Sequence, residues 1–549
     1  MNQDNKFSPW YGLYTALKII KIPFNQFVLQ VDNQFPKDSF FSKQRATIHG
    51  IEFNERNMYG FGNLNLYTVL NYLDLFEKFI KNKLGQKRSK NILLSFSNLD
   101  QTNSQMFDYC LKYLVANKNQ VYTFNFNLAN DYLIQSALSN MNADYGFFVD
   151  YVPSNNKYYL KIYFDNKLID FSLMQTMINK LQGNSSQLSF ANNAEAIKLN
   201  IDKILDASFS GVKTLNNQFI SNYNSFIVYS MIDNKLSEHI LNRFLTKFNI
   251  KHIKLNPKLN QDLVSNSKWR FLSWAWRSNY KADLIILIDI NQRLKVIVKS
   301  KKGYVTLNED QLVYLFIHNH YLTWKNDELL TNNQFVIPID ASSLILKLLN
   351  IFKINYVYEN SLNQSNHILF DYFKGSYSVQ KNQNLNFESF DFLFSLILMM
   401  QNYKNNNNLF SYKYQKMLKA SDRCFLSYKY LKHNPNDLYN LYNHLKERQR
   451  LNKAIKIQSI NWIDFSNLGY TYLINIRLKI KYAEVNLFIN YDLATKQIEL
   501  KFETQLLTTK HWKFSDKLHE KLLVIQIKNS INRLIKKLAK QTKGAKNDK

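Results

Sequence analysis

Three residue types that usually shape a protein are scarce in this chain: glycine, proline and cysteine. Among 549 residues there are 12 glycines, 7 prolines and 2 cysteines, whereas typical usage is about 7% for glycine and about 5% for proline. Cys110 and Cys424 are far apart, and neither has a Cys or His beside it at metal-ligand spacing. This excludes a disulfide framework and a zinc ribbon, and favours two buried or incidental thiols in a reducing compartment.

The abundant residues are Asn, Lys, Ile, Phe and Tyr. Their codons are rich in A+T, whereas glycine and proline codons are rich in G+C, so we infer an A+T-rich genome such as an organelle's. We therefore expect a mitochondrial location. The same bias weakens Asn as a signal of turns and helix caps, because it is then frequent for mutational reasons as well.

Long apolar runs are also missing. The best candidate, Phe390–Met400, is shorter than the ~18 residues that span a bilayer and contains Asp391 and Ser395. A buried core helix is the better interpretation, and we expect no transmembrane segment. The first residues, MNQDNKFSPWYG, resemble neither a signal peptide nor an Arg-rich transit peptide, which suits a cytosolic protein or one made inside the organelle.

Positive charge is the main feature that the sequence does have. There are 71 Lys and Arg against 42 Asp and Glu, a net charge of +29. Such a charge attracts polyanions, either nucleic acid or an anionic membrane. A hydrophobic content of 46% with 15% aromatic residues argues against a disordered basic tail. We expect a folded protein of about three to four domains.

Hydrophobic patterning predicts four regions of an α/β protein. Residues 1–190 form a mixed α/β region, with a helix at Leu66–Lys83, a strand at Ile92–Phe96 and a hairpin within Phe147–Ile169. Residues 191–358 form a Rossmann-like parallel sheet flanked by helices, because their apolar runs suit strands buried on both faces. These runs are Phe226–Tyr229, Leu284–Ile288, Val296–Val298 and Phe335–Ile337.

The second half is expected to differ from this core. Residues 359–462 are predicted to be mainly helical, with an exposed polar loop at Lys404–Asn408. Residues 463–549 are predicted to form a C-terminal antiparallel β-meander with a basic outer face, then a basic amphipathic helix and tail. The helix is expected to present one apolar face, made by Leu518, Leu522, Ile525, Ile531, Leu534, Ile535 and Leu538.

Motifs for catalysis are weak. Gly60-Phe61-Gly62 lacks the following residues of a phosphate-binding loop. Asp283 and Lys299 resemble the acidic strand and the lysine of restriction-type nucleases, but Ile297 stands where the second metal-binding carboxylate belongs. His318 and His320 form an isolated pair, whereas zinc usually has three or four ligands. We expect no catalytic residue, no metal and no cofactor.

Basic residues interleaved with aromatic ones are the stronger signal, because indole and guanidinium planes stack on unpaired bases while cations meet phosphates. The segment Lys268–Lys281 is one example, although a helix with Trp toward the core is an equal alternative for it; for the basic run 446–456 a solvated face is slightly favoured. The candidate RNA-binding residues are Lys268, Trp269, Arg270, Trp274, Trp276, Arg277, Lys281, Arg448, Arg450, Lys453, Arg533, Lys536, Lys537 and Lys540.

Two parts of the chain resemble the second small-subunit ribosomal protein family. The first comprises Ile48-His49-Gly50, Met58-Tyr59-Gly60, the run from Asn63 to Leu73, and Ile92–Asn98. The second comprises Ala282–Asp289 and Phe335–Ser343. The family's Arg-Trp-Leu-Gly-Gly segment is reduced to Trp269–Leu272 at best, and the spacing between the parts is expanded.

The resemblance implies a structural constituent of the mitochondrial small ribosomal subunit, not an enzyme. Its expected partners are rRNA and other mitochondrial ribosomal proteins, with no small-molecule substrate. Two alternatives stay open: a nucleic-acid-binding protein with a degenerate nuclease-like fold, and a peripheral membrane-associated subunit that uses the C-terminal helix.

Overall fold

Contacts divide the chain of the computed structural model into two units, Met1–Gly211 and Val212–Lys549. The structure describes residues 7–547 apart from the segments 35–39, 48–49, 85–88, 98–99, 125–128, 153–156, 166, 182–187, 216–225, 233, 256–280, 289–293, 302, 332, 359–366, 374–375, 380–389, 421–423, 435, 464–472, 493–496 and 508–513.

The first unit is built on one eight-stranded sheet of order β1-β2-β6-β5-β3-β4-β8, with β7 paired to β6. Strands β5, β3, β4 and β8 pair parallel with one another, and the pairings among β1, β2, β6 and β7 and between β6 and β5 are antiparallel. The strands are β1 Arg45–Thr47, β2 Gly50–Phe53, β3 Asn91–Phe96, β4 Gln120–Phe124, β5 Tyr145–Val152, β6 Lys157–Phe164, β7 Lys167–Leu168 and β8 Ile197–Leu199.

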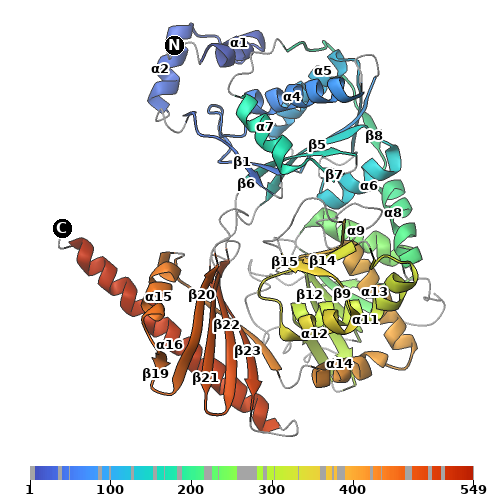
Figure 1. Ribbon diagram of the computed structural model, residues 1–549. Helices are drawn as coiled ribbons and strands as arrows, with labels where there is room; N and C mark the ends of the chain where they lie inside the picture. The colour runs from blue at the N-terminus through green and yellow to red at the C-terminus, as the bar shows by residue number, and fades with distance from the viewer. Residues whose placement is uncertain are drawn as a thin grey trace. The chain divides into compact units, whose positions relative to one another are not determined.

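The helices here are α1 Ser8–Ala16, α2 Phe24–Gln34, α4 Leu66–Leu84, α5 Gln101–Ala116, α6 Asp131–Met141, α7 Phe171–Leu181 and α8 Ile201–Leu215, whose last residues belong to the second unit. Helices α1, α2, α4, α5 and α7 form the hydrophobic core of the first unit together with its sheet (Figure 1). The predicted helix at 66–83 and strand at 92–96 are confirmed as α4 and β3. Val69, Leu73 and Phe76 of α4 are fully buried, and each such side chain contributes about 1.5–3 kcal/mol.

The second unit contains three sheets. A five-stranded sheet has the order β10-β9-β11-β12-β13, and a four-stranded sheet has the order β15-β14-β16-β17. Their elements are β9 Ile227–Ile232, α9 Lys235–Lys247, β10 Lys251–Lys254, β11 Leu284–Ile288, β12 Leu294–Ser300, β13 Gly303–Leu307, α11 Glu309–Asn326, β14 Asn333–Ile337, α12 Ser343–Phe352, β15 Tyr356–Tyr358, β16 His367–Phe373, β17 Ser376–Val379, α13 Phe390–Asn405 and α14 Leu409–Ala420.

The third sheet has the order β18-β23-β22-β21-β20-β19, and every pairing in it is antiparallel. Helices α15 and α16 contact it, and α16 crosses it in Figure 1. The elements are β18 Cys424–Leu431, α15 Asn436–Lys446, β19 Arg450–Asn452, β20 Ile455–Ile463, β21 Leu473–Ile480, β22 Ala483–Asp492, β23 Gln497–Leu506 and α16 Phe514–Asn547.

The α/β class is confirmed, but the predicted parallel core at 191–358 differs from the structure. Strand β12 runs antiparallel to β11, and β14 belongs to another sheet. The physical reason is the short connection 289–293, since a parallel crossover needs a dozen or more residues. Runs such as Leu284–Ile288 are buried on both faces, so burial alone did not reveal strand direction.

Two further expectations about the second half need correction. The region 359–462 holds strands β16 to β20 as well as α13, α14 and α15, because amphipathic strands there pack into sheets with distant partners. On α16 the core face is made by Leu523, Val524, Ile527, Ile531 and Ile535, whereas Leu518, Leu522 and Ile525 are exposed. The predicted apolar face is therefore confirmed at Ile531 and Ile535, with Leu534 packed against the core, and was wrong in the first part of the helix.

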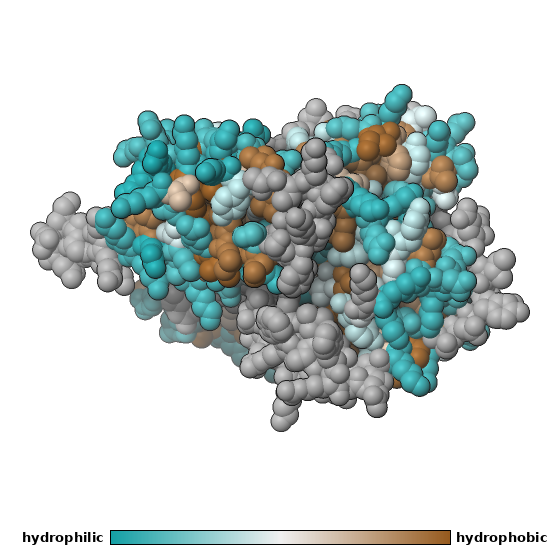
Figure 2. All heavy atoms as spheres, turned by 90° about the horizontal axis from the view of Figure 1, so that it is seen from below, coloured by the Kyte–Doolittle hydropathy of each residue, from teal (hydrophilic) through white to brown (hydrophobic). Residues whose placement is uncertain are grey.

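Helix α13 confirms the core-helix interpretation of Phe390–Met400, all of which is buried. No helix among the described residues is long and apolar enough to cross a membrane. The face shown in Figure 2 is mostly hydrophilic, and its hydrophobic residues lie in separate patches.

Candidate functional site

Strand order points to the edges where a ligand would bind. In open α/β sheets ligands bind outside the carboxyl ends of strands, at the point where successive connections leave in opposite directions. In the first unit this switch point lies between β3 and β5, because β4 flanks β3 on its other side. In the second unit the switch points lie between β9 and β11 and between β14 and β16.

Polar side chains gather at the β3–β5 switch point. Ser97 follows β3, and its Oγ accepts a 2.7 Å hydrogen bond from the Tyr151 amide of β5. Asp100 caps α5 by accepting a 2.9 Å hydrogen bond from the Asn103 amide. Arg56 forms an ion pair with Asp100. The structure thus places a serine hydroxyl, a carboxylate and a guanidinium at the edge that the topology favours.

The ion pair at this edge orients a guanidinium that remains accessible. Burial disfavours ionisation of Asp100, but hydrogen bonds from the Asn103 amide and from Arg56 outweigh it and lower the pKa of the carboxyl below its usual value. Arg56 keeps a side-chain exposure of 35%, and its Cζ lies 5.9 Å from the Tyr158 ring centroid. A guanidinium that is positioned yet accessible can bind a phosphoryl group through two parallel hydrogen bonds.

The edge at β14 and β16 carries a buried ion cluster, which we call the Lys501 cluster. Lys501 of β23 lies 3.1 Å from Asp310 Oδ2 and 3.6 Å from Asp340 Oδ2, and it donates to the Asp340 carbonyl. Tyr372 of β16 donates a 3.1 Å hydrogen bond to Asp310. The cluster ties the six-stranded sheet to α11 and to the end of β14.

Burial limits what the Lys501 cluster can do. Asp310 is inaccessible to solvent, and Lys501 is 3% exposed. Burial raises the pKa of Asp310, and Lys501 only partly offsets this. The two aspartates raise the pKa of Lys501 against the opposing effect of burial, which keeps the amine charged. We interpret the cluster as a positioning element for the strand ends, since no ligand can reach Asp310.

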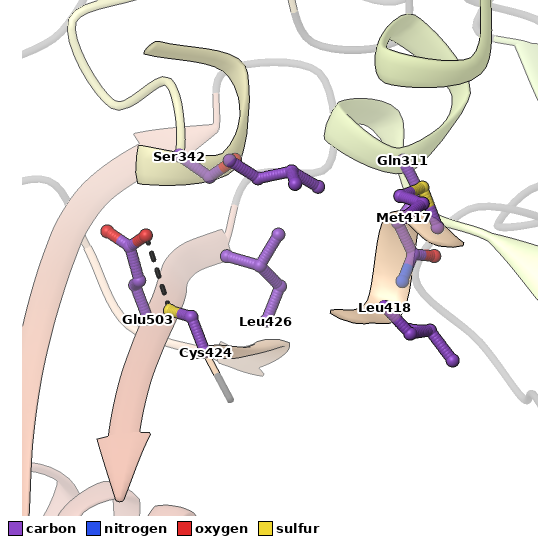
Figure 3. Close-up of a pocket in the computed structure, with 8 residues that line it drawn as sticks. Gln311, Ser342, Met417, Leu418, Cys424, Leu426 and Glu503 are labelled. Atoms are coloured by element: carbon purple, nitrogen blue, oxygen red, sulfur yellow. Dashed lines mark hydrogen bonds between the residues drawn. The ribbon is translucent and has the colours of Figure 1, made fainter. Parts of the chain in front are cut away.

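A small pocket lies beside this cluster (Figure 3). Its volume of about 20 Å³ admits about one water molecule. Glu503 accepts hydrogen bonds from the Ser343 amide, at 2.8 Å, and from the Cys424 thiol, at 3.3 Å. Burial is the larger cause of the raised pKa of Cys424, and the negative charge of Glu503 is the next. The thiol is therefore protonated at neutral pH, and the pocket is too small for a sugar.

The nuclease-like interpretation fails at its central residue. Asp283 Oδ2 is 2.7 Å from Lys404 Nζ and accepts a 2.9 Å hydrogen bond from the Ile227 amide, so this carboxylate ties β11 to α13 and β9. Lys299 is exposed. His320 is buried, with Nδ1 2.9 Å from the Phe316 carbonyl. Among the described residues no group of three His, Cys, Asp or Glu could hold a metal ion.

The residues predicted to bind RNA are only partly described. Lys268, Trp269, Arg270, Trp274, Trp276 and Arg277 lie outside the described residues, as does the side chain of Lys540. The remaining seven are exposed, namely Lys281, Arg448, Arg450, Lys453, Arg533, Lys536 and Lys537. Arg448 and Lys537 come together near His444, whose pKa is lowered by burial and by these two cations.

Comparison with known proteins finds solved structures with a similar fold. The chain is similar to a solved structure described as a putative phosphomannomutase from Thermus thermophilus, with a TM-score of 0.54 over 84% of this chain and 95% of that chain, at 9% identity. It is likewise similar to the open form of parafusin, a phosphoglucomutase from Paramecium, with a TM-score of 0.54. That match covers 84% of this chain and 91% of parafusin, at 10% sequence identity. The fold is that of these sugar-phosphate mutases. No family model and no curated protein matches the sequence.

This finding overturns the ribosomal interpretation. The resemblance to the small-subunit ribosomal protein family was wrong, and so were the expectations of a non-enzymatic rRNA-binding protein without a small-molecule substrate, because the structural neighbours are sugar-phosphate mutases. The nuclease-derived and membrane-associated alternatives fall with it. Where they are described, the segments that carried the resemblance include parts of β2 and α4 as well as β3, β11 and β14. Such segments are local patterns that any α/β protein can share.

Several site residues escaped the sequence analysis. Asp100 offered a signal, since it directly precedes an amphipathic helix as a capping residue does. Asp310 offered another, being an acidic residue within a buried helix. Lys501 and Arg56 offered none, because each is one cation among 71 Lys and Arg and only the fold shows its partner.

Proposed function

We propose that this protein is an enzyme that acts on sugar phosphates and relocates a phosphoryl group, as a mutase does. The observation that carries the proposal is the shared fold, which spans 84% of this chain and 95% of the Thermus thermophilus structure. Similarity of fold alone is an argument by analogy, so the chemistry of the strand ends has to support it.

The charge of the chain supports a phosphorylated substrate. A net charge of +29 draws anionic ligands to the protein. A phosphoryl relocation breaks one O–P bond and forms another on the same sugar, so composition and net charge are unchanged. The protein then has to bind the phosphoryl group in both positions and exclude water, a task for positioned cations and closed sites.

Arg56 is the described cation best placed for this role. It pairs with Asp100 at the β3–β5 switch point, where Ser97 also lies, and its guanidinium is accessible. We infer that Arg56 binds a phosphoryl oxygen pair while Asp100 fixes its orientation. The parallel strands around this edge would then serve as a Rossmann-like layer, and the antiparallel C-terminal strands with α16 as an appended meander and helix. A mitochondrial location also remains a proposal, supported by an amino-acid composition that implies A+T-rich codons.

The test is conversion of hexose phosphates. Purified full-length protein is incubated with glucose 1-phosphate or mannose 1-phosphate and Mg²⁺, and ³¹P NMR follows formation of the 6-phosphate. We expect conversion in the wild type and a loss of about 10²-fold or more in Arg56→Gln, because one charged phosphoryl contact is removed. Arg45→Gln is the matched control, since Arg45 is an exposed arginine on β1.

One result would contradict the proposed activity, and another would contradict the role assigned to Arg56. One is a folded wild-type protein that neither converts hexose phosphates nor is stabilised by them against heat. The other is an Arg56→Gln variant as active as Arg45→Gln, which would remove Arg56 from the site while leaving the sugar-phosphate activity standing.

A further inference from the structure

A second pocket lies among three helices of the second unit. Its volume is about 170 Å³. Helix α11 contributes Tyr314, Leu315 and His318, helix α13 contributes Tyr403, and helix α14 contributes Lys413, Lys416 and Ala420. Helices α11 and α13 both pack against α14. We call this the α11–α14 pocket.

The α11–α14 pocket carries positive charge without a counter-charge. Lys413 and Lys416 line it, and no carboxylate does so among the residues that the structure describes. Burial and then Lys416 lower the pKa of Lys413. Burial, then Lys413 and Lys416, lower the pKa of His318. The fold therefore holds two amines and an imidazole close enough that Lys416 disfavours the charged forms of Lys413 and His318.

Two polar atoms of residues that line the pocket lack a hydrogen-bond partner within the described part of the chain. Tyr403 is 2% exposed, and its Oη has no hydrogen-bond partner within the described part of the chain. The same holds for the buried Nδ1 of His318. Leaving a buried polar atom unpaired is unfavourable, so native proteins rarely do it without a reason such as a missing ligand. Both atoms belong to residues that line the pocket.

We propose that the α11–α14 pocket binds a phosphoryl dianion, either inorganic phosphate or the phosphate of a small phosphomonoester. Lys413 and Lys416 neutralise its charge, and the Tyr403 hydroxyl and the His318 imidazole donate hydrogen bonds to its oxygens. Its volume is below the ~300–1,000 Å³ of pockets that enclose drug-sized molecules, so it takes the phosphoryl end and not a whole buried sugar. Its lining residues belong to the second unit, whereas the β3–β5 edge belongs to the first, and binding there needs no turnover.

Isothermal titration of the full-length chain with inorganic phosphate tests the proposal, with NaCl adjusted to constant ionic strength. We expect saturable binding that Lys413→Gln weakens about tenfold or more, because a charge-assisted hydrogen bond is lost. Lys419→Gln is the matched control: Lys419 is an exposed lysine on the same helix that does not line the pocket. Equal affinities of the two variants would overturn the proposal.

Tyr403→Phe distinguishes a ligand site from a structural one. Without ligand, the variant should unfold at the same or a higher temperature than the wild type, because a buried unpaired hydroxyl is removed. Its affinity for phosphate should nevertheless fall severalfold. A variant that loses stability and keeps the affinity would show that the hydroxyl serves the fold, and would overturn its assignment as a ligand donor.

Two further arms identify the source of the phosphoryl group and separate this site from the proposed active site. Glucose 6-phosphate that competes with phosphate for the pocket indicates a phosphomonoester ligand, whereas phosphate binding without competition indicates the free anion. Arg56→Gln should leave phosphate affinity at the α11–α14 pocket unchanged. If Arg56→Gln abolishes all phosphate binding and Lys413→Gln abolishes none, the pocket proposal fails and the strand-end site stands.

Discussion

Replacing Lys501 by Met should be among the most destabilising single changes in the second unit. Lys501 is the one described cation within 4.0 Å of the Asp310 carboxylate, and Asp310 has no solvent access. Methionine matches the length of the lysine stem, so packing is nearly kept while the charge is lost. The change therefore isolates the electrostatic role of the Lys501 cluster.

The expected loss is about 3–5 kcal/mol in the free energy of unfolding, the usual effect of leaving one buried charge without its partner. Adding Asp310→Asn to Lys501→Met should recover most of that loss, because residue 310 then carries no buried charge. The Tyr372 hydroxyl can still donate a hydrogen bond to the amide oxygen of the asparagine. Asp340 keeps a side-chain exposure of 20% and can stay hydrated, so the double variant should lie within about 2 kcal/mol of the wild type.

Hydrogen exchange followed by mass spectrometry measures this locally, using peptides that cover α11 and β23 against peptides of the first unit as an internal reference. Lys479→Met is the control, because Lys479 is exposed and should change stability by less than about 0.5 kcal/mol. The reasoning is refuted if Lys501→Met leaves protection of α11 and β23 within about 1 kcal/mol of the wild type, or if the double variant is no better than the single one.

Three further predictions concern pH, backbone and capping. Burial raises the pKa of Asp371 from 3.8 to about 7, so the folded state retains the proton of this carboxyl and loses stability as the pH rises from about 4 through 7. Asp371→Asn should therefore be more stable than the wild type at pH 8, by on the order of 2 kcal/mol after allowing for partial solvent access. Urea titrations should show that this difference vanishes near pH 4. Gly50 has φ +119°, and a Cβ there would lie 2.5 Å from the Leu160 carbonyl oxygen, so Gly50→Ala should lower thermal stability by about 2–3 kcal/mol; an unchanged Tm would contradict this. Asn308 forms a capping box with Gln311 at the start of α11, so Asn308→Ala should cost about 1 kcal/mol in the same assay, and a stabilised variant would disprove the role of the cap.

The comparison between sequence and structure is clearest in strand pairing. The run Leu284–Ile288 was correctly predicted to be a buried strand, since five apolar residues in a row suit burial on both faces. Its partner directions were not predictable from burial. The short link to β12 made that pair antiparallel, and β9 became its parallel neighbour only through a crossover that reaches back from residue 284 to residue 228.

Functional inference from the sequence failed for a related reason. Strand-and-loop segments such as Ile92–Asn98 and Phe335–Ser343 repeat in many α/β proteins, so their likeness to a ribosomal family reflected local structure. A mitochondrial location, which the codon bias suggests, stays a prediction. The candidate site was invisible because its members, such as Arg56 and Asp100, are 44 residues apart and neither belongs to a recognisable motif.

By itself the sequence determined that the chain folds, that it mixes helices and strands, and that it attracts anions, because burial periodicity and net charge are local or summed properties of the residues. Only the tertiary structure decided the sheet order, the pairing of Lys501 with Asp310, and the meeting of Lys413, Lys416, His318 and Tyr403 in one pocket. These depend on contacts between residues far apart in the chain, whose formation rests on the packing of the whole core.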